Sequence, residues 1–478
     1  MKPDESGDIG GDGGGDRAGA AAVGRPGDTA TDSPPSATGT VPQPDPGVGG
    51  TDTDGPHNGP LPEALVAVAP EVLADSLGEY VRAWAKRIRS GESGALPILT
   101  GLVVIIIIFQ VQQPKFLSAG NIVNLLVQAT FFVLLGLGEL FALILSEIDL
   151  SVGFVGGIGA TITLALLSPS YGWPWWAAVI VGLLACAAIG AVQGILITRL
   201  HLPSFVVTLA SLLGLGGVLI FLFDSFNGAV GGVISLASSG PVYDLVNGNM
   251  SPLAGWVTLV VLVGLYALFS IARNTRRRAR GLSAPPLSII IFTIVVTAAA
   301  GAALVAVCNV NRGNLVPLKG VPWVFPMVLA VVVLWSLLLA KTRTGRYLYA
   351  IGGSPEAARR AGIAVPWIRT TGFTLAAFTA GLGGLVYASR LGSISVGYDG
   401  ATYVLYAVAA AVIGGASLFG GHGKAIHALL GGVLIAAVVN GLALLGVSTA
   451  GEEIATALVL LAAVTVDSLV RRRGSSTT

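Results

Sequence analysis

Two carboxylates in an otherwise apolar stretch are the residues of this chain best suited to chemistry. Glu147 and Asp149 stand in the sequence Glu-Ile-Asp-Leu-Ser-Val-Gly-Phe, between the apolar runs 131–145 and 151–167. An acid inside membrane-grade sequence is costly unless it faces a cavity or a partner, so it indicates a functional site. Ser151 and Gly153 follow directly and favour a helix that begins or breaks at this point. We therefore expect all four residues to mark a pathway or a helix break.

The two acids are expected to have separate roles. On a helix, residues two positions apart point about 200° away from each other, so a carboxylate pair is not favoured. We expect Asp149 to cap or brace a helix that starts near Ser151. Glu147 would instead face the inner end of a pathway or a basic partner. An alternative stays open, in which Glu139, Glu147 and Asp149 form the ion site of a secondary transporter.

The elements that must position these acids are apolar helices. Hydrophobic residues make up 53% of the 478 residues and charged residues only 11%, which predicts an all-α, polytopic helical membrane protein. We expect about 10–12 transmembrane segments, with segments three and ten short enough to be re-entrant or broken. The twelve apolar segments are 96–111, 122–145, 151–167, 174–197, 204–223, 253–271, 287–308, 323–340, 370–388, 403–414, 426–446 and 453–469.

The distribution of basic residues predicts the orientation. With a cytoplasmic N-terminus, the inner loops and flanks hold 20 Lys and Arg residues and the outer loops hold 4. Cytoplasmic loops of membrane proteins carry such an excess, so both termini are expected inside. Asn440 is polar within the apolar segment 426–446 and either bonds to another helix or lines a pathway.

The chain divides into four regions by composition. Residues 1–60 are rich in Gly, Asp and Pro and are expected to be a disordered tail. Residues 61–92 show helical apolar spacing with basic residues at the end, which predicts an amphipathic helix on the membrane surface. The membrane domain is expected at 93–470, and a short cytoplasmic tail at 471–478.

The inner loop 341–369 contains a well-marked short helix. Ser354 suits the N-cap, Pro355 the first helical position, and Glu356 complements the helix dipole. Gly362 is expected just after the last turn. The loop helix comprises Ser354, Pro355, Glu356, Ala357, Ala358, Arg359, Arg360, Ala361 and Gly362. From the residues alone it could dock a partner or simply connect two spans.

No nucleotide, metal or nucleic-acid site is predicted. The Gly-rich stretch 412–424 resembles a phosphate loop, but the pattern requires Gly where Leu418 stands, and Ser or Thr where Ala425 stands. We interpret it as a tight turn beside a broken helix. His201, His422 and His427 lack metal-ligand spacing, and Cys186 and Cys308 lie in apolar runs. We expect no cofactor and no enzymatic activity.

Several stretches together carry a resemblance to a known family. Glu147–Gly153, Gly345–Gly362, Ile413–Gly421 and Val439–Gly446 are similar, in order and spacing, to permease subunits of bacterial ABC importers for monosaccharides. The branch is that of ribose, xylose, arabinose and galactose, and the extra basic loop and apolar pair at 272–308 look most like the xylose-type members. The long N-terminal tail departs from the family.

This resemblance implies a permease in the bacterial inner membrane that works with partners. It implies a second permease copy, two ABC ATPase subunits that use ATP, an extracytoplasmic sugar-binding protein and membrane lipid. It also implies that the loop helix Ser354–Gly362 couples ATPase closure to the permease. Which sugar is carried is left open.

Overall fold

The computed structural model describes residues 96–226, 231–282, 284–313, 317–448, 450–458 and 461. The expected tail 1–60, the expected surface helix 61–92 and the C-terminal residues 471–478 lie outside the described residues, as does most of the last apolar segment. The described residues all belong to one compact unit.

Helices account for nearly all of the described fold. In chain order they are α2 (Leu96–Gln112), α3 (Ala119–Ile144), α4 (Val152–Leu167), α5 (Trp175–Arg199), α6 (Ser204–Ser225), α7 (Pro241–Asn247), α8 (Pro252–Ala279), α9 (Leu287–Asn309), α10 (Val324–Lys341), α11 (Arg343–Gly353), α12 (Pro355–Arg360), α13 (Val365–Leu391), α14 (Gly400–Ile413) and α15 (Ala425–Leu444).

The prediction of an all-α polytopic membrane protein is confirmed. Among the described residues, eight helices are long and apolar enough to cross a membrane, and three further apolar helices are shorter. The expected short segments three and ten are α4, with 16 residues, and α14, with 14. Both are too short to span a bilayer alone, because a span needs about 20 residues.

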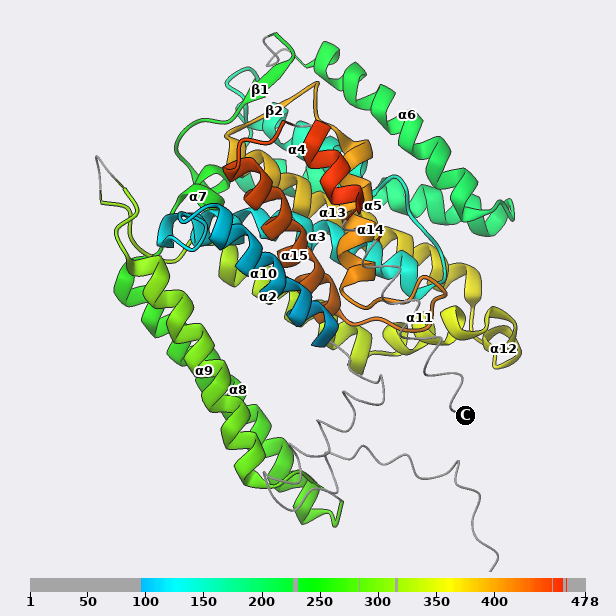
Figure 1. Cartoon of the computed structure of the whole chain (residues 1–478). Coiled ribbons are helices and arrows are strands. Elements are labelled where there is room, and N and C mark those ends of the chain that lie inside the picture. Colours follow the sequence, from blue (N-terminus) through cyan, green and yellow to red (C-terminus); the bar gives the residue numbers. More distant parts are fainter. Residues whose placement is uncertain are drawn as a thin grey trace, which may run out of the picture. The chain divides into compact units, whose positions relative to one another are not determined.

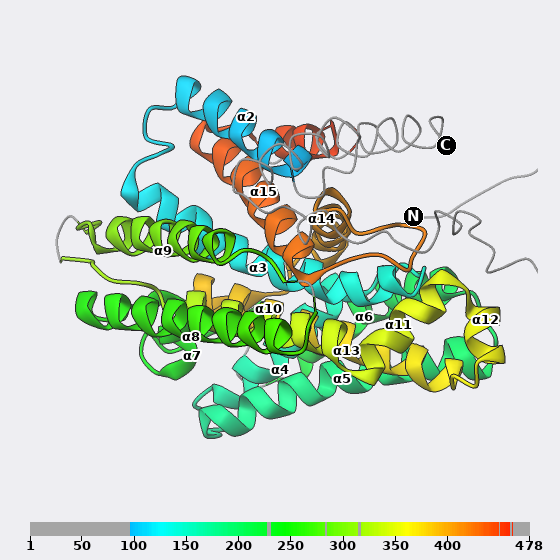
Figure 2. The ribbon, with the colours of Figure 1, turned by 90° about the horizontal axis from the view of Figure 1, so that it is seen from below.

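The core is built around α3 and α13. Figures 1 and 2 show α3 inside the bundle, where it packs against α13, α14 and α15, and α13 packs in turn against α5 and α4. Small residues allow these close approaches. A side chain at Gly384 on α13 would collide with the backbone of Gly156 on α4, and one at Gly190 on α5 with the backbone of Phe373 on α13.

One small sheet interrupts the helical pattern. Strand β1 (Val233–Ser235) pairs antiparallel with β2 (Ser393–Ser395), with Ile234 opposite Ile394. The pairing joins the segment after α6 to the segment after α13. We call this end of the bundle the β end, and the end where α11 and α12 lie the α12 end.

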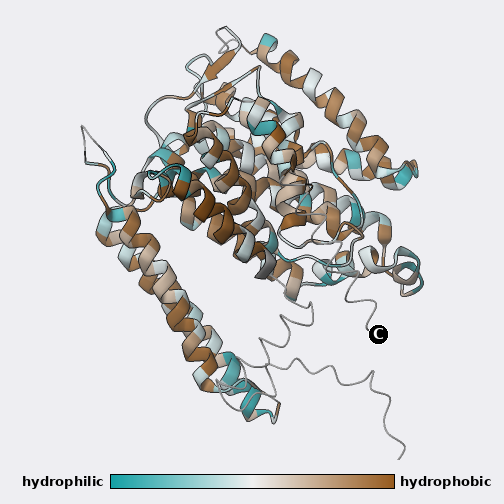
Figure 3. Ribbon diagram, in the orientation of Figure 1, coloured by the Kyte–Doolittle hydropathy of each residue, from teal (hydrophilic) through white to brown (hydrophobic). Residues whose placement is uncertain are grey.

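Helices α8 and α9 form a hairpin with little buried surface. The buried residues of α8 are Gly255 and Asn274, and those of α9 are Ile289, Val305 and Cys308. Gly255 on α8 lies close to Val305 on α9 and to Val321, toward the β end. Figure 3 shows the hairpin as mostly hydrophobic with hydrophilic residues at its far end. Lipid chains would cover such a surface in a membrane.

Candidate functional site

The acidic stretch of the sequence forms a break between α3 and α4. Helix α3 ends at Ile144 and α4 begins at Val152. Ser146 in the break has φ +65°, which is unusual for a residue other than glycine. Its hydroxyl donates to the carbonyl oxygens of Gly352 and Phe419, each 2.9 Å away. These two tertiary contacts hold the left-handed turn in place.

Glu147 forms an ion pair that ties the break to α13. Its Oε1 lies 2.8 Å from Nη2 of Arg369, one turn into α13, and the Glu147 side chain is only 5% exposed. The next residue, Ile148, accepts a hydrogen bond at its carbonyl oxygen from Thr208 on α6, at 3.2 Å. The break is thereby attached to both α13 and α6.

Asp149 organises the start of α4. Its Oδ1 accepts hydrogen bonds from the backbone N–H of Ser151, at 2.9 Å, and from the Ser151 hydroxyl, at 2.6 Å. This is an Asx turn, in which an aspartate bonds to the backbone two residues on. The Ser151 hydroxyl also accepts from Nε2 of Gln193 on α5, at 2.7 Å. The backbone N–H of Asp149 donates to Oε1 of Glu139 on α3, at 3.3 Å.

The two acids of the break therefore face different partners. Glu147 and Asp149 are not on a helix, so the helical geometry considered for them does not apply. Asp149 instead lies beside Glu139, and both of these side chains are fully buried. One oxygen of each, Oδ2 of Asp149 and Oε2 of Glu139, accepts no hydrogen bond from a described residue.

Gly153 places the first turn of α4 directly against α14. A Cβ at Gly153 would overlap the carbonyl oxygen of Gly400, at the start of α14. The carbonyl oxygen of Gly153 accepts a hydrogen bond from the Tyr398 hydroxyl, at 3.0 Å. The starts of the two short apolar helices thus meet, and a shift of one must displace the other.

The Gly-rich stretch lies against the end of α3. Its turns need Gly415, Gly420 and Gly421, with φ of +103°, +80° and +69°. The N–H of Gly421 donates to the carbonyl oxygen of Ile144, at 3.0 Å. The carbonyl oxygen of Gly423 accepts from the Tyr349 hydroxyl of α11, at 2.5 Å, and burial raises the pKa of that hydroxyl.

Helix α12 lies exposed next to this cluster. The Ser354 hydroxyl accepts from the N–H of Ala357, at 3.2 Å, and Pro355 is the first helical residue. At the other end Gly362 has φ +80°, and Ile363 N–H donates to Ala358 O, at 3.0 Å, which forms a Schellman motif. Glu356 pairs with Arg359 and Arg360, at 3.5 and 3.3 Å, on the solvent side.

The structure separates one candidate residue from the rest. Asn440 on α15 accepts a hydrogen bond from Nδ2 of Asn121, at 2.8 Å. Asn121 lies near the start of α3, whereas the break follows the other end of that helix. Glu147, Asp149, Ser151 and Gly153 lie together in the break and the first turn of α4. The loop helix is joined to them through α13, whose first turns carry Arg369.

Several residues of this site were not singled out in the sequence. Arg369 counted only as one basic residue of an inner loop, and Ser146, Gln193 and Tyr349 were not among the candidates. Gln193 is a polar residue within an apolar run, as Asn440 is, and that feature could have marked it. Arg369 could not be matched to Glu147, because 222 residues separate them and charges in loops are common.

This arrangement defines a multi-pass membrane protein with a buried polar break that is linked to an exposed loop helix. The sequence model described as "Branched-chain amino acid transport system / permease component" matches residues 121–466. The chain belongs to this family of permease components.

Curated relatives align over most of the chain. The xylose transport system permease protein of Escherichia coli (strain K12) is 32% identical over 79% of this chain and 92% of its own length. That of Haemophilus influenzae is 33% identical, over 79% and 96%. The ribose import permease protein of E. coli (strain K12) is 28% identical, over 81% and 96%. These relatives are transport permeases and not enzymes. No solved structure matches the chain.

Proposed function

We propose that this chain is the translocation subunit of an ATP-binding-cassette importer for a monosaccharide, with the pentose xylose as the first candidate substrate. Three kinds of relatives support the substrate class, since their names specify xylose, D-allose and ribose transport. The xylose permeases are more similar to this chain than the allose and ribose permeases among these relatives. All three sugars are aldoses.

The partners follow from this assignment. Two ATPase subunits bind at the α12 end, an extracytoplasmic binding protein delivers sugar at the β end, and a second permease copy completes the pathway. The excess of basic residues on the loops of the α12 end supports a cytoplasmic position for that end and for both termini. The chain itself lies in the bacterial inner membrane.

The contact that carries the proposal is the ion pair between Glu147 and Arg369. Helix α12 ends in the Gly362 turn, and α13 begins three residues later at Val365. A push on α12 by an ATPase subunit therefore moves the first two turns of α13, which carry Arg369. Glu147 is drawn with it, because the ion pair is mostly shielded from water. The break then shifts the start of α4 against Gly400 of α14.

The secondary-transporter alternative gains no support from the comparisons, and two of its three acids already have polar partners. A coupling acid should be able to release and rebind its ion, whereas Glu147 is neutralised by Arg369 and Asp149 is engaged by Ser151. The residues instead act as structural connections between helices.

The substrate is tested with the reconstituted complex. The permease, its ATPase and its binding protein are placed in proteoliposomes, and ATP hydrolysis is measured with xylose, ribose, allose, arabinose and galactose. We expect a pentose, xylose first, to stimulate hydrolysis most. Stimulation by branched-chain amino acids and by none of the sugars would contradict the proposed substrate class.

A further inference from the structure

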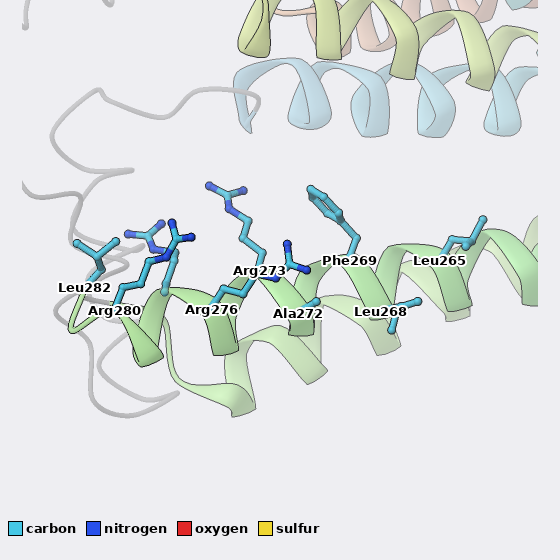
Figure 4. A pocket seen from close by; sticks show the side chains of 9 residues that line it. Leu265, Leu268, Phe269, Ala272, Arg273, Arg276, Arg280 and Leu282 are labelled. Carbon is cyan, nitrogen blue, oxygen red and sulfur yellow. The ribbon is translucent and has the colours of Figure 1, made fainter.

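The inner end of α8 carries an apolar patch and a basic patch on one face. Leu265, Leu268 and Phe269 are followed by Arg273, Arg276 and Arg280 at steps of three or four residues, which is the spacing of a single helix face. Figure 4 shows Phe269 and Arg273 pointing to the same side of α8. The three apolar side chains are 59%, 68% and 61% exposed.

This face borders an open groove of about 730 Å³. The groove is lined by α8 and by Leu282 just after it, with apolar residues toward the middle of the helix and guanidinium groups toward its end. We call it the α8 groove. The side chains of Arg273, Arg276 and Arg280 form no salt bridge or hydrogen bond with a described residue.

The neighbouring sequence is basic and contains no acid. Five arginines fall within Arg273–Arg280, while the sequence has no Asp or Glu between Asp244 and Glu356. Arginine at a helix C-terminus also complements the helix dipole, but the dipole effect does not require the arginines to lie on one face of the helix. An apolar patch that leads into a guanidinium cluster along one face matches an acyl chain that leads into a phosphate.

We propose that the α8 groove binds an anionic phospholipid of the inner leaflet, with its phosphate at Arg273, Arg276 and Arg280 and an acyl chain along Leu265 and Phe269. The assignment to the inner leaflet rests on the orientation given under the proposed function. Binding is measured on the purified chain without transport, so a failure here is distinguishable from a failure of the transport assignment.

The test compares lipids and matched variants. Native mass spectrometry of the full-length chain measures binding of dioleoylphosphatidylglycerol and dioleoylphosphatidylcholine. We expect the anionic lipid to bind more tightly, and Arg276→Gln to weaken it about fivefold. Arg278→Gln is the matched control, because it removes the same charge at the same helix end. Arg278 lies outside the groove lining, and its side chain donates to the carbonyl oxygen of Pro285. Equal binding of both lipids, or equal effects of both variants, would refute lipid binding in the α8 groove.

A second measurement identifies the occupant in the cell. Phe269→p-benzoylphenylalanine is expected to form a photo-adduct with the mass of a phospholipid. The control is Phe292→p-benzoylphenylalanine on α9, which is 53% exposed and outside the groove lining, and which should not favour anionic lipid. An adduct with the acidic N-terminal segment of the same chain, an adduct with another protein, or no adduct would overturn the proposal.

Discussion

Glu147 in the break after α3 and Arg369 in the second turn of α13 form an ion pair of 2.8 Å, although 222 residues separate them in the chain. Arg369 lies seven residues beyond Gly362, the residue that ends the α12 turn. The pair is thus one of two polar connections among the described residues from the break toward the exposed loop helix, the other being the bond from Ser146 to Gly352 just before that helix. The ion pair gives the buried Glu147 carboxylate an opposite charge in an apolar environment.

Removal of both partners of this pair should cost less than the sum of the two single removals. Glu147→Gln or Arg369→Gln leaves a mostly buried charge without its partner and should cost about 1–3 kcal/mol of stability, with a loss of transport. The double variant should be less damaged than the sum of the two, because neither charge remains. Thermal unfolding in detergent measures this coupling. Arg343→Gln, at an exposed position on α11, is the control, and additive losses would show that the pair is not coupled.

The loop helix should matter for coupling more than for stability. Glu356 is exposed, and its pairs with Arg359 and Arg360 are worth about 0.3–0.5 kcal/mol each. Glu356→Arg should therefore lower the unfolding temperature little but separate ATP hydrolysis from uptake or prevent ATPase binding. Glu356→Gln, which keeps the size of the side chain, should be milder. Full uptake with normal ATPase co-purification in Glu356→Arg would contradict a docking role.

The contact of α4 with α14 should not tolerate a methyl group. Gly153→Ala forces a Cβ against the carbonyl oxygen of Gly400 and should cost about 1–3 kcal/mol. Gly217→Ala on α6 is the matched control, because nothing lies near its added Cβ. The unfolding temperature and the rate of uptake should fall only in Gly153→Ala. If both variants behave alike, the close approach is not required.

The Asx turn before α4 should depend on the oxygen acceptor of Asp149. Asp149→Ala leaves the N–H and hydroxyl of Ser151 without this partner and should cost about 1.5–3 kcal/mol. Asp149→Asn keeps an acceptor oxygen and should be less severe, although its bonds are no longer charge-assisted. Yield of folded protein and uptake are the measurements. An unaffected Asp149→Ala variant would exclude the brace.

Much of this fold could be predicted from the apolar periodicity of the sequence, but its short amphipathic parts could not. Helix α11 lies in the expected inner loop 341–369 and was not predicted, because Gly345, Gly352 and Gly353 disfavour helix. Tertiary contacts stabilise it: Gly352 fits against the carbonyl oxygen of Ile144, where a side chain would not fit. Helix α12 could be predicted because its Ser354 cap and Gly362 stop are local signals.

The site was partly predictable for a similar reason. Acids in an apolar run are visible in one sequence, and Glu147 and Asp149 were found that way. Glu147 pairs with Arg369, and Asp149 bonds to Ser151, which in turn accepts from Gln193. Of these three residues only Ser151 is close to the acids in sequence. Packing of α4 against α5 and of α3 against α13 determines the other two contacts, and a single sequence does not contain that information.

The central claim is that transport is driven by ATP in partner subunits and not by an ion gradient through the buried acids. Uptake of radiolabelled xylose into vesicles that hold the permease, its ATPase, internal ATP and external binding protein tests this most directly. Uptake should require ATP and binding protein and should persist when a protonophore is added. Uptake that continues without ATP and stops with the protonophore would contradict the account and would make Glu139, Glu147 and Asp149 the residues to examine for ion coupling.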